Sequence, residues 1–243
     1  MRICRFCDLR ATTAEHAWPK WALDLLGPSA TIETWLGPDA SPRTWRGRGT
    51  RVKHLCAGCN NGWMSDLENR SKALVGALMS DISMRVDRVG QDLITVWAVK
   101  TAMVFECTNP AKRSFYTRAE RERLRTALEA PADTLVWLGR QERSSLAWCE
   151  ARRLFASHPP GNTILSDGYV TTLAISRLVI QILTVRRAPG GEGVRVTLLS
   201  KPGPWERSLV QIAPGRPSAN WPPMESFNEP ALGDLSGRFR DPD

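Results

Sequence analysis

The chain has 243 residues, of which 42% are hydrophobic and 24% are charged, a composition typical of a globular protein that excludes wholesale disorder. Its 33 Lys and Arg exceed its 25 Asp and Glu, and the resulting charge of +8 favours polyanionic partners over cationic substrates. The start of the chain carries arginines and cysteines instead of an apolar run, and its most apolar segment, 173–185, is shorter than the roughly 20 residues that cross a bilayer. We therefore expect a soluble, cytoplasmic protein with no membrane partner.

The positive charge is concentrated in two stretches of the chain. Residues 1–63 contain nine basic and five acidic side chains, and residues 110–125 contain six and two. Each stretch has a net charge of +4, so the remainder sums to zero. We expect two surfaces, or one composite surface, that contact a phosphate backbone.

Turn signals in the first 60 residues leave room only for short elements, and we predict strands over 30–36 and 51–55 followed by a helix from about 60 to 79. Two C-x2-C pairs frame this region, Cys4 with Cys7 and Cys56 with Cys59, and 48 residues lie between them. Each pair can chelate from one tight turn, so together they predict a tetrahedral zinc site. The alternative is two unrelated pairs of reduced thiols.

The remainder of the chain mixes helical and strand patterns. Helical spacing predicts a helix over 92–107, and the capping box formed by Thr117 and Glu120 predicts another that ends before Pro131. We predict strands over 134–138, 146–155, 194–199 and 208–212, an apolar helix over 171–187, and an extended, wrapping or partly disordered Pro/Gly-rich tail after Pro214. The predicted fold class is α+β, with a zinc-stapled module at 1–80, an α+β companion domain at 90–213 and a tail at 214–243.

The residues between and after the cysteine pairs resemble a known family. Glu15-His16 is followed by Pro19, and Asn60 directly follows Cys59. This order resembles the HNH endonucleases of the ββα-metal, or His-Me finger, superfamily, over about residues 1–70. The resemblance implies a β-hairpin and a helix that hold one catalytic divalent cation, Mg²⁺ or Mn²⁺, braced by a zinc knuckle.

Carried over residue by residue, the resemblance makes Glu15 an acidic metal ligand, His16 the general base and Asn60 a second metal ligand. Asp is more usual than Glu15 in the family, and no His follows Asn60, so the third ligand is open. Glu68 could approach the metal, although a solvated helix carboxylate is the interpretation we favour. Non-catalytic alternatives are a structural His16 near the zinc site and an Asn60 that only caps the helix. Because adjacent residues of a regular strand face opposite sides, we expect an irregular strand at Glu15 and His16.

Several basic and aromatic residues are candidates for contact with nucleic acid, since guanidinium groups bind phosphates and an indole ring can stack on bases. These are Arg43, Trp45, Arg46, Arg48 and Arg51 in the first stretch and Arg118, Arg121 and Arg125 on the predicted helix. An exposed basic hairpin without a ligand and a solvated helix face are the alternatives. For Lys100, within an apolar helix, both a surface position and a position facing the cleft stay open.

The leading hypothesis is a metal-dependent HNH-type endonuclease that hydrolyses phosphodiester bonds in DNA, with RNA not excluded. The alternative is a non-catalytic, zinc-stapled nucleic-acid-binding protein. A third possibility gives the companion domain a protein partner or a role in homo-oligomers.

Overall fold

The computed structural model of the protein describes residues 2–27, 30–36, 43–46, 51–108, 114–158, 163–187, 200 and 203–239; of residues 35–36, 43–46, 155–158, 163–166 and 187 it describes the backbone alone. The helices are α1 (Lys20–Leu26), the π-helical η1 (Cys59–Met64), α2 (Ser65–Met79), α3 (Arg88–Glu106), α4 (Arg118–Ala127), α5 (Trp205–Ser208) and α6 (Glu229–Ser236). The strands are β1 (Thr13–His16), β2 (Thr31–Leu36), β3 (Arg43–Arg46), β4 (Arg51–Leu55), β5 (Met84–Asp87), β6 (Thr134–Gln141), β7 (Leu146–His158), β8 (Thr163–Ile175), β9 (Leu178–Arg187), β10 (Leu209–Ala213), β11 (Ser218–Trp221) and β12 (Ser226–Phe227).

A large sheet forms the centre of the protein. Its strand order is β10-β6-β9-β8-β7-β2-β3, and β12 pairs with β6 outside this path. All neighbours are antiparallel except β2 with β7 and β12 with β6. Both helices and strands contribute substantially, so the predicted α+β class is confirmed. The division into segments 1–80, 90–213 and 214–243 stays a prediction.

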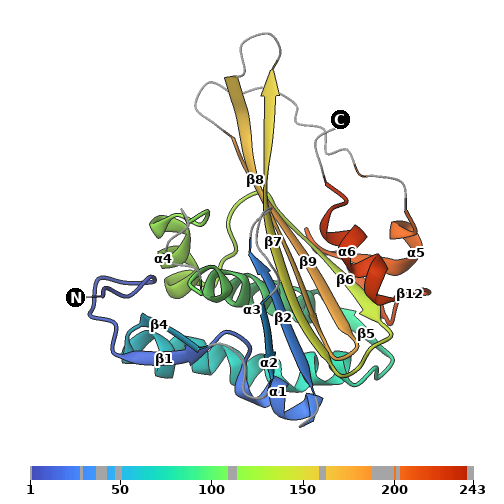
Figure 1. The fold of residues 1–243 in the computed structure, drawn as a ribbon, viewed down its shortest axis with the longest axis horizontal. Helices are drawn as coiled ribbons and strands as arrows, with labels where there is room; N and C mark the ends of the chain where they lie inside the picture. Colours follow the sequence, from blue (N-terminus) through green and yellow to red (C-terminus); the bar gives the residue numbers. More distant parts are fainter. Residues whose placement is uncertain are drawn as a thin grey trace.

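Helices cover both faces of this sheet (Figure 1). On β7, Cys149 belongs to the core shared with α3, whereas its neighbour Trp148 belongs to the core shared with α6. This alternation places α3 and α6 on opposite faces. Trp97 on α3 is completely buried, and truncating such a side chain typically costs about 3–5 kcal/mol.

The predicted apolar helix at 171–187 is wrong, because this segment forms the end of β8 and all of β9. The two strands pair antiparallel from Ser166 with Arg187 to Ile175 with Leu178. Burial on both faces removes the alternation of apolar and polar residues that normally marks a strand. The turn between the strands has Ser176 at φ 53°, a left-handed conformation. The sequence has no Gly or Asn at this position, the residues that usually indicate such a turn.

Most other predicted elements are present. The strand over 51–55 is β4, and those over 30–36, 134–138, 146–155 and 208–212 correspond to β2, β6, β7 and β10; the one over 194–199 lies outside the described residues. The capping box is confirmed, since the Glu120 N–H donates to the Thr117 hydroxyl (3.2 Å) and the Thr117 N–H donates to the Glu120 carboxylate (2.7 Å). Helix α3 starts four residues before the predicted position because Asp87 caps it, accepting from the Gly90 N–H at 2.8 Å.

The tail after Pro214 is folded over much of its length, so of the predicted states, extended, wrapping or partly disordered, the disordered one is wrong there and the wrapping one agrees with the structure. β11 pairs with β5, β12 joins the large sheet, and α6 packs on β7 and β8. The apolar side chains of Trp221, Phe227, Leu232 and Leu235 are buried. Their burial stabilises a segment whose local turn signals alone favour irregular structure.

A small N-terminal sheet of two strands is separate from the large sheet. β1 and β4 form a two-stranded antiparallel sheet, and η1 and α2 follow β4 directly (Figure 1). The Trp18 ring meets the Phe105 ring edge-on at 5.1 Å, and the Trp21 ring lies 6.3 Å from that of Trp97. Both contacts join the N-terminal region to α3. No helix in the described part of the chain combines the length and the apolar surface that a membrane crossing requires.

Candidate functional site

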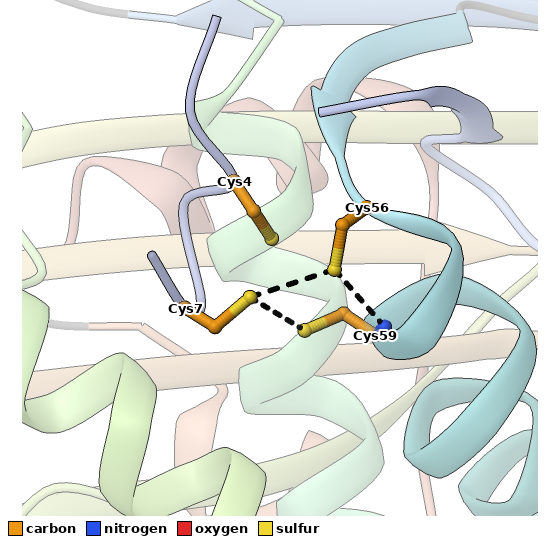
Figure 2. Close-up of side chains that lie close together, drawn as sticks. All are labelled: Cys4, Cys7, Cys56 and Cys59. Carbon is orange, nitrogen blue, oxygen red and sulfur yellow. Dashed lines mark hydrogen bonds between the residues drawn. The ribbon is translucent and has the colours of Figure 1, made fainter. Parts of the chain in front are cut away.

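The four paired cysteines meet at one point, from the N-terminal loop and from the end of β4 (Figure 2). The Sγ atom of Cys7 lies 3.5 Å from that of Cys56 and 3.7 Å from that of Cys59, and all four Sγ atoms lie within 4.8 Å of one another. Four thiolates 2.3 Å from a tetrahedral zinc ion would be about 3.8 Å apart. The cluster therefore fits a metal such as zinc, as the spacing predicts.

Backbone hydrogen bonds hold the two cysteine turns in place. The Cys4 N–H donates to the Leu9 carbonyl (2.8 Å), and the Arg5 N–H donates to the His54 carbonyl (3.0 Å), which ties the first turn to β4. In the second turn the Cys59 N–H donates to the Cys56 sulfur (3.3 Å). Donation to sulfur stabilises a thiolate, which is the form that binds a metal.

The metal-free thiols differ in acidity. Burial raises the pKa of Cys7 and of Cys59. Burial acts in the same direction on Cys56, yet the Cys59 N–H and the neighbouring thiols outweigh it, so the pKa of Cys56 falls. Metal binding must therefore displace protons from this cluster, and the affinity will rise with pH.

Strand β1 carries Glu15 and His16 next to the metal cluster. Glu15 pairs with Val52 and His16 with Arg51, and the register shifts between Thr13 and Glu15. The strand is therefore irregular, but the irregularity lies before Glu15 and not between Glu15 and His16, which pair with consecutive residues of β4. The Arg51 guanidinium donates to the Ala14 carbonyl (3.4 Å) at the distorted position.

Glu15 and Asn60 lie close together although 44 residues separate them. The Asn60 side chain lies close enough to the Glu15 carboxylate to lower the pKa of that carboxylate. Asn60 lies inside η1, whose cap position is Gly58, so the alternative in which Asn60 only caps the helix does not hold. Burial raises the pKa of Glu15, while the charges of Lys100 and Arg51 and the side chain of Asn60 act in the opposite direction.

Two further charged side chains reach this site from α2 and α3. Glu68 lies near enough to Glu15 to raise its pKa, and the Lys100 ammonium pairs with the Glu68 carboxylate. Lys100 is 2% exposed, so it neither snorkels to solvent nor stands unpaired. The interpretation of Glu68 as a solvated carboxylate is wrong, because its side chain is 15% exposed and bound to Lys100. The sequence did contain a signal for this position: Glu68 follows Asn60 by eight residues on one helical segment, and residues at that spacing lie on a similar face.

The residues predicted to contact nucleic acid differ in exposure and in ion pairing. Arg51 and Arg118 are exposed, and Arg118 pairs with Asp8; Arg125 is partly exposed and pairs with Glu122. Arg121 is a correction: it is 2% exposed and pairs with Glu106, so it cannot offer its guanidinium to a phosphate. The side chains of Arg43, Trp45 and Arg46, and the whole of Arg48, lie outside the described residues.

Within the described ranges, the four cysteines are the one group of three or more His, Cys, Asp and Glu residues whose ligand atoms lie close enough together to hold a metal ion. Glu15, His16 and Glu68 do not form such a group. Comparisons with protein-family models, with curated proteins and with solved structures give no match for this chain.

Proposed function

We propose that the protein is a metal-dependent endonuclease of the HNH type, which hydrolyses phosphodiester bonds in DNA. The observation that carries this proposal is the meeting of Glu15 with Asn60 beside the four-cysteine cluster. His16 adjoins Glu15 on a distorted strand. Two antiparallel strands followed by a helix also support it, since the resemblance implies this arrangement.

His16 is the group we assign to proton transfer. Imidazole has an unperturbed pKa near 6.5, so a neutral His16 can accept a proton from the attacking water at ordinary pH. The water oxygen then forms a bond to phosphorus, and the bond from phosphorus to the leaving oxygen breaks. A general base typically contributes about 10²–10⁴-fold in rate.

The donor set at Glu15 and Asn60 fits a hard divalent cation. Carboxylate and amide oxygens are ligands that Mg²⁺ and Mn²⁺ accept, and Glu68 adds a second carboxylate nearby. A cation held there would neutralise the charge that builds on the phosphate and on the leaving oxygen. Glu15 and Asn60 would hold it, and they already lie close together.

Plasmid cleavage tests the proposal. Wild-type protein with Mg²⁺ or Mn²⁺ should nick or cut the plasmid, and His16→Ala should lose about 10²–10⁴-fold in rate. Asn60→Ala should lose cleavage as well, and Asn61→Ala is its matched control, because Asn61 is an exposed neighbour of the same type. Equal rates in the wild type and His16→Ala would remove His16 from the mechanism. Binding of DNA without cleavage under any divalent cation would favour the binding-only alternative.

A further inference from the structure

A basic cavity adjoins the cysteine cluster at Cys4. It has a volume of about 500 Å³ and opens between the N-terminal loop, β4 and the start of α4. Its polar lining includes Arg2 and Arg5 from the loop, His54 from β4 and Arg118 from α4. Figure 1 shows α4 and the N-terminal segment on the same side of the molecule, and the ion pair of Arg118 with Asp8 connects them. The volume lies within the range of small-ligand sites.

The charge of this cavity is unbalanced. Four arginines line it, and no Asp or Glu is among the described residues that do so. Arg121 is neutralised by Glu106 and points into the core, and Arg118 pairs with Asp8, which lies outside the lining. The guanidinium groups of Arg2 and Arg5 thus form the local excess, and their planar donor pairs match phosphate oxygens.

The cavity wall is fixed by the backbone. The Arg2 carbonyl accepts from the Ala11 N–H (2.9 Å), and Arg5 is tied to His54 as described above. Cys4, between the two arginines, belongs to the metal cluster. Arginines held on a rigid wall lose less freedom when they bind an anion than arginines on a free loop.

We propose that this cavity binds a backbone phosphate of a nucleic-acid strand, at a position separate from the candidate catalytic site. The identification of the polyanion as nucleic acid rests on the proposed function. His54 lies two residues along β4 from Val52, the partner of Glu15, which is about 7 Å at the usual rise of a strand. A bound nucleic-acid strand covers this distance within a few nucleotides. The cavity thereby fixes which phosphodiester bond reaches Glu15 and His16.

Fluorescence anisotropy with a labelled single-stranded oligonucleotide tests this binding directly. The buffer contains no added divalent cation and no chelator, because a chelator would strip a structural zinc ion. The double variant Arg2→Gln/Arg5→Gln should bind about tenfold more weakly, and its salt dependence should fall by about 0.7 in slope, the loss of one phosphate contact. The control Arg85→Gln/Arg216→Gln removes the same charge from exposed positions on and near β5 and β11, and it should bind within about twofold of wild type. Equal weakening in both double variants would overturn the proposal.

A gain of binding gives a test that misfolding cannot imitate. Asp8 is 79% exposed and occupies the Arg118 guanidinium. Asp8→Asn should release Arg118 and tighten binding several-fold, whereas unchanged or weaker binding contradicts the proposal. Oligonucleotides with and without a 5′-phosphate should bind equally; a requirement for the 5′-phosphate would assign the cavity to a terminal phosphate and overturn the backbone assignment.

The two proposals can fail separately. All binding measurements are repeated in the His16→Ala background, where cleavage is not expected. A protein that binds through the cavity but never cleaves would refute the nuclease proposal alone. A protein that cleaves, yet whose Arg2→Gln/Arg5→Gln variant binds as the control does, would refute the cavity proposal alone.

Discussion

Helix α3 carries two buried ion pairs, and they differ in how fully their charges are satisfied. Near its end, Glu106 pairs with Arg121 of α4, and it also accepts from the Phe115 N–H and the Ser114 hydroxyl. Arg121 in turn donates to the Met103 carbonyl (3.1 Å). We call this a closed pair, because the hydrogen bonds and the ion pair leave few free donors or acceptors on Glu106 and Arg121 to bind a ligand.

The second pair lies six residues earlier on the same helix and has the opposite character. Lys100 pairs with Glu68, and the carboxylate of Glu15 lies within electrostatic reach of both. Two carboxylates thus share the ammonium of Lys100, and the charge of Arg51 also acts on Glu15. The comparison teaches that burial of a charged side chain does not by itself mark a functional site; the proposed site is distinguished by Glu15, a carboxylate that forms no ion pair with the described residues.

Breaking the closed pair should have the largest effect on stability. Arg121→Ala leaves Glu106 buried without its counter-charge, and we expect a loss of about 3–5 kcal/mol in the free energy of unfolding. Denaturant unfolding measures it. Arg123→Ala is the control on the same helix: its ion pair with Glu129 is exposed, so its loss should cost at most about 1 kcal/mol. Equal costs for the two variants would show that the buried pair contributes no more than a surface pair.

Removing Lys100 should change the acidity of the open site. In Lys100→Met the ammonium no longer favours ionised Glu15, so the pKa of Glu15 should rise further. NMR titration of the Glu15 carboxyl group measures this without any activity. Lys72→Met, which removes an exposed charge from α2, should leave the titration unchanged. A titration that does not move in Lys100→Met would separate Lys100 from the site.

Glu15→Gln is expected to change the stability of the protein by a smaller amount, measured in the absence of divalent cations. Burial raises the pKa of Glu15, so the folded protein holds its proton to higher pH than the unfolded chain does, and stability falls as pH rises through this range. Glutamine cannot ionise. The variant should therefore match wild type in acid and be more stable at neutral pH, while it loses cleavage. Thermal unfolding across this pH range checks the sign, and a variant less stable than wild type at neutral pH would contradict it.

The four-cysteine cluster was predictable because two C-x2-C pairs impose their own geometry. Glu15 and Asn60 were predictable as a pair only through the resemblance, since no local pattern brings residues 45 positions apart into contact. Lys100 illustrates a limit of the sequence: its position within an apolar helix fits a surface and a buried role equally. Its ion pair with Glu68 depends on how α2 packs against α3.

The β8–β9 hairpin shows a different limit. Its strands are buried by α3 on one face and by α6 on the other, so tertiary packing removes the period of two that would identify them. The β-branched residues of this segment, such as Thr171, Thr172 and Ile180, were the remaining signal for strand. The burial of Arg121 was equally hidden, because helical spacing groups it with the exposed Arg118.

The most direct test of the account is a crystal structure of the protein soaked in Mn²⁺, with anomalous scattering to identify each metal. We predict one tetrahedral ion bound by Cys4, Cys7, Cys56 and Cys59, and a second ion bound by oxygen ligands at Glu15 and Asn60 beside His16. Manganese at the second position, with zinc at the first, would support the catalytic site. A soaked crystal with the cysteine site filled and no ion at Glu15 and Asn60 would contradict the central claim.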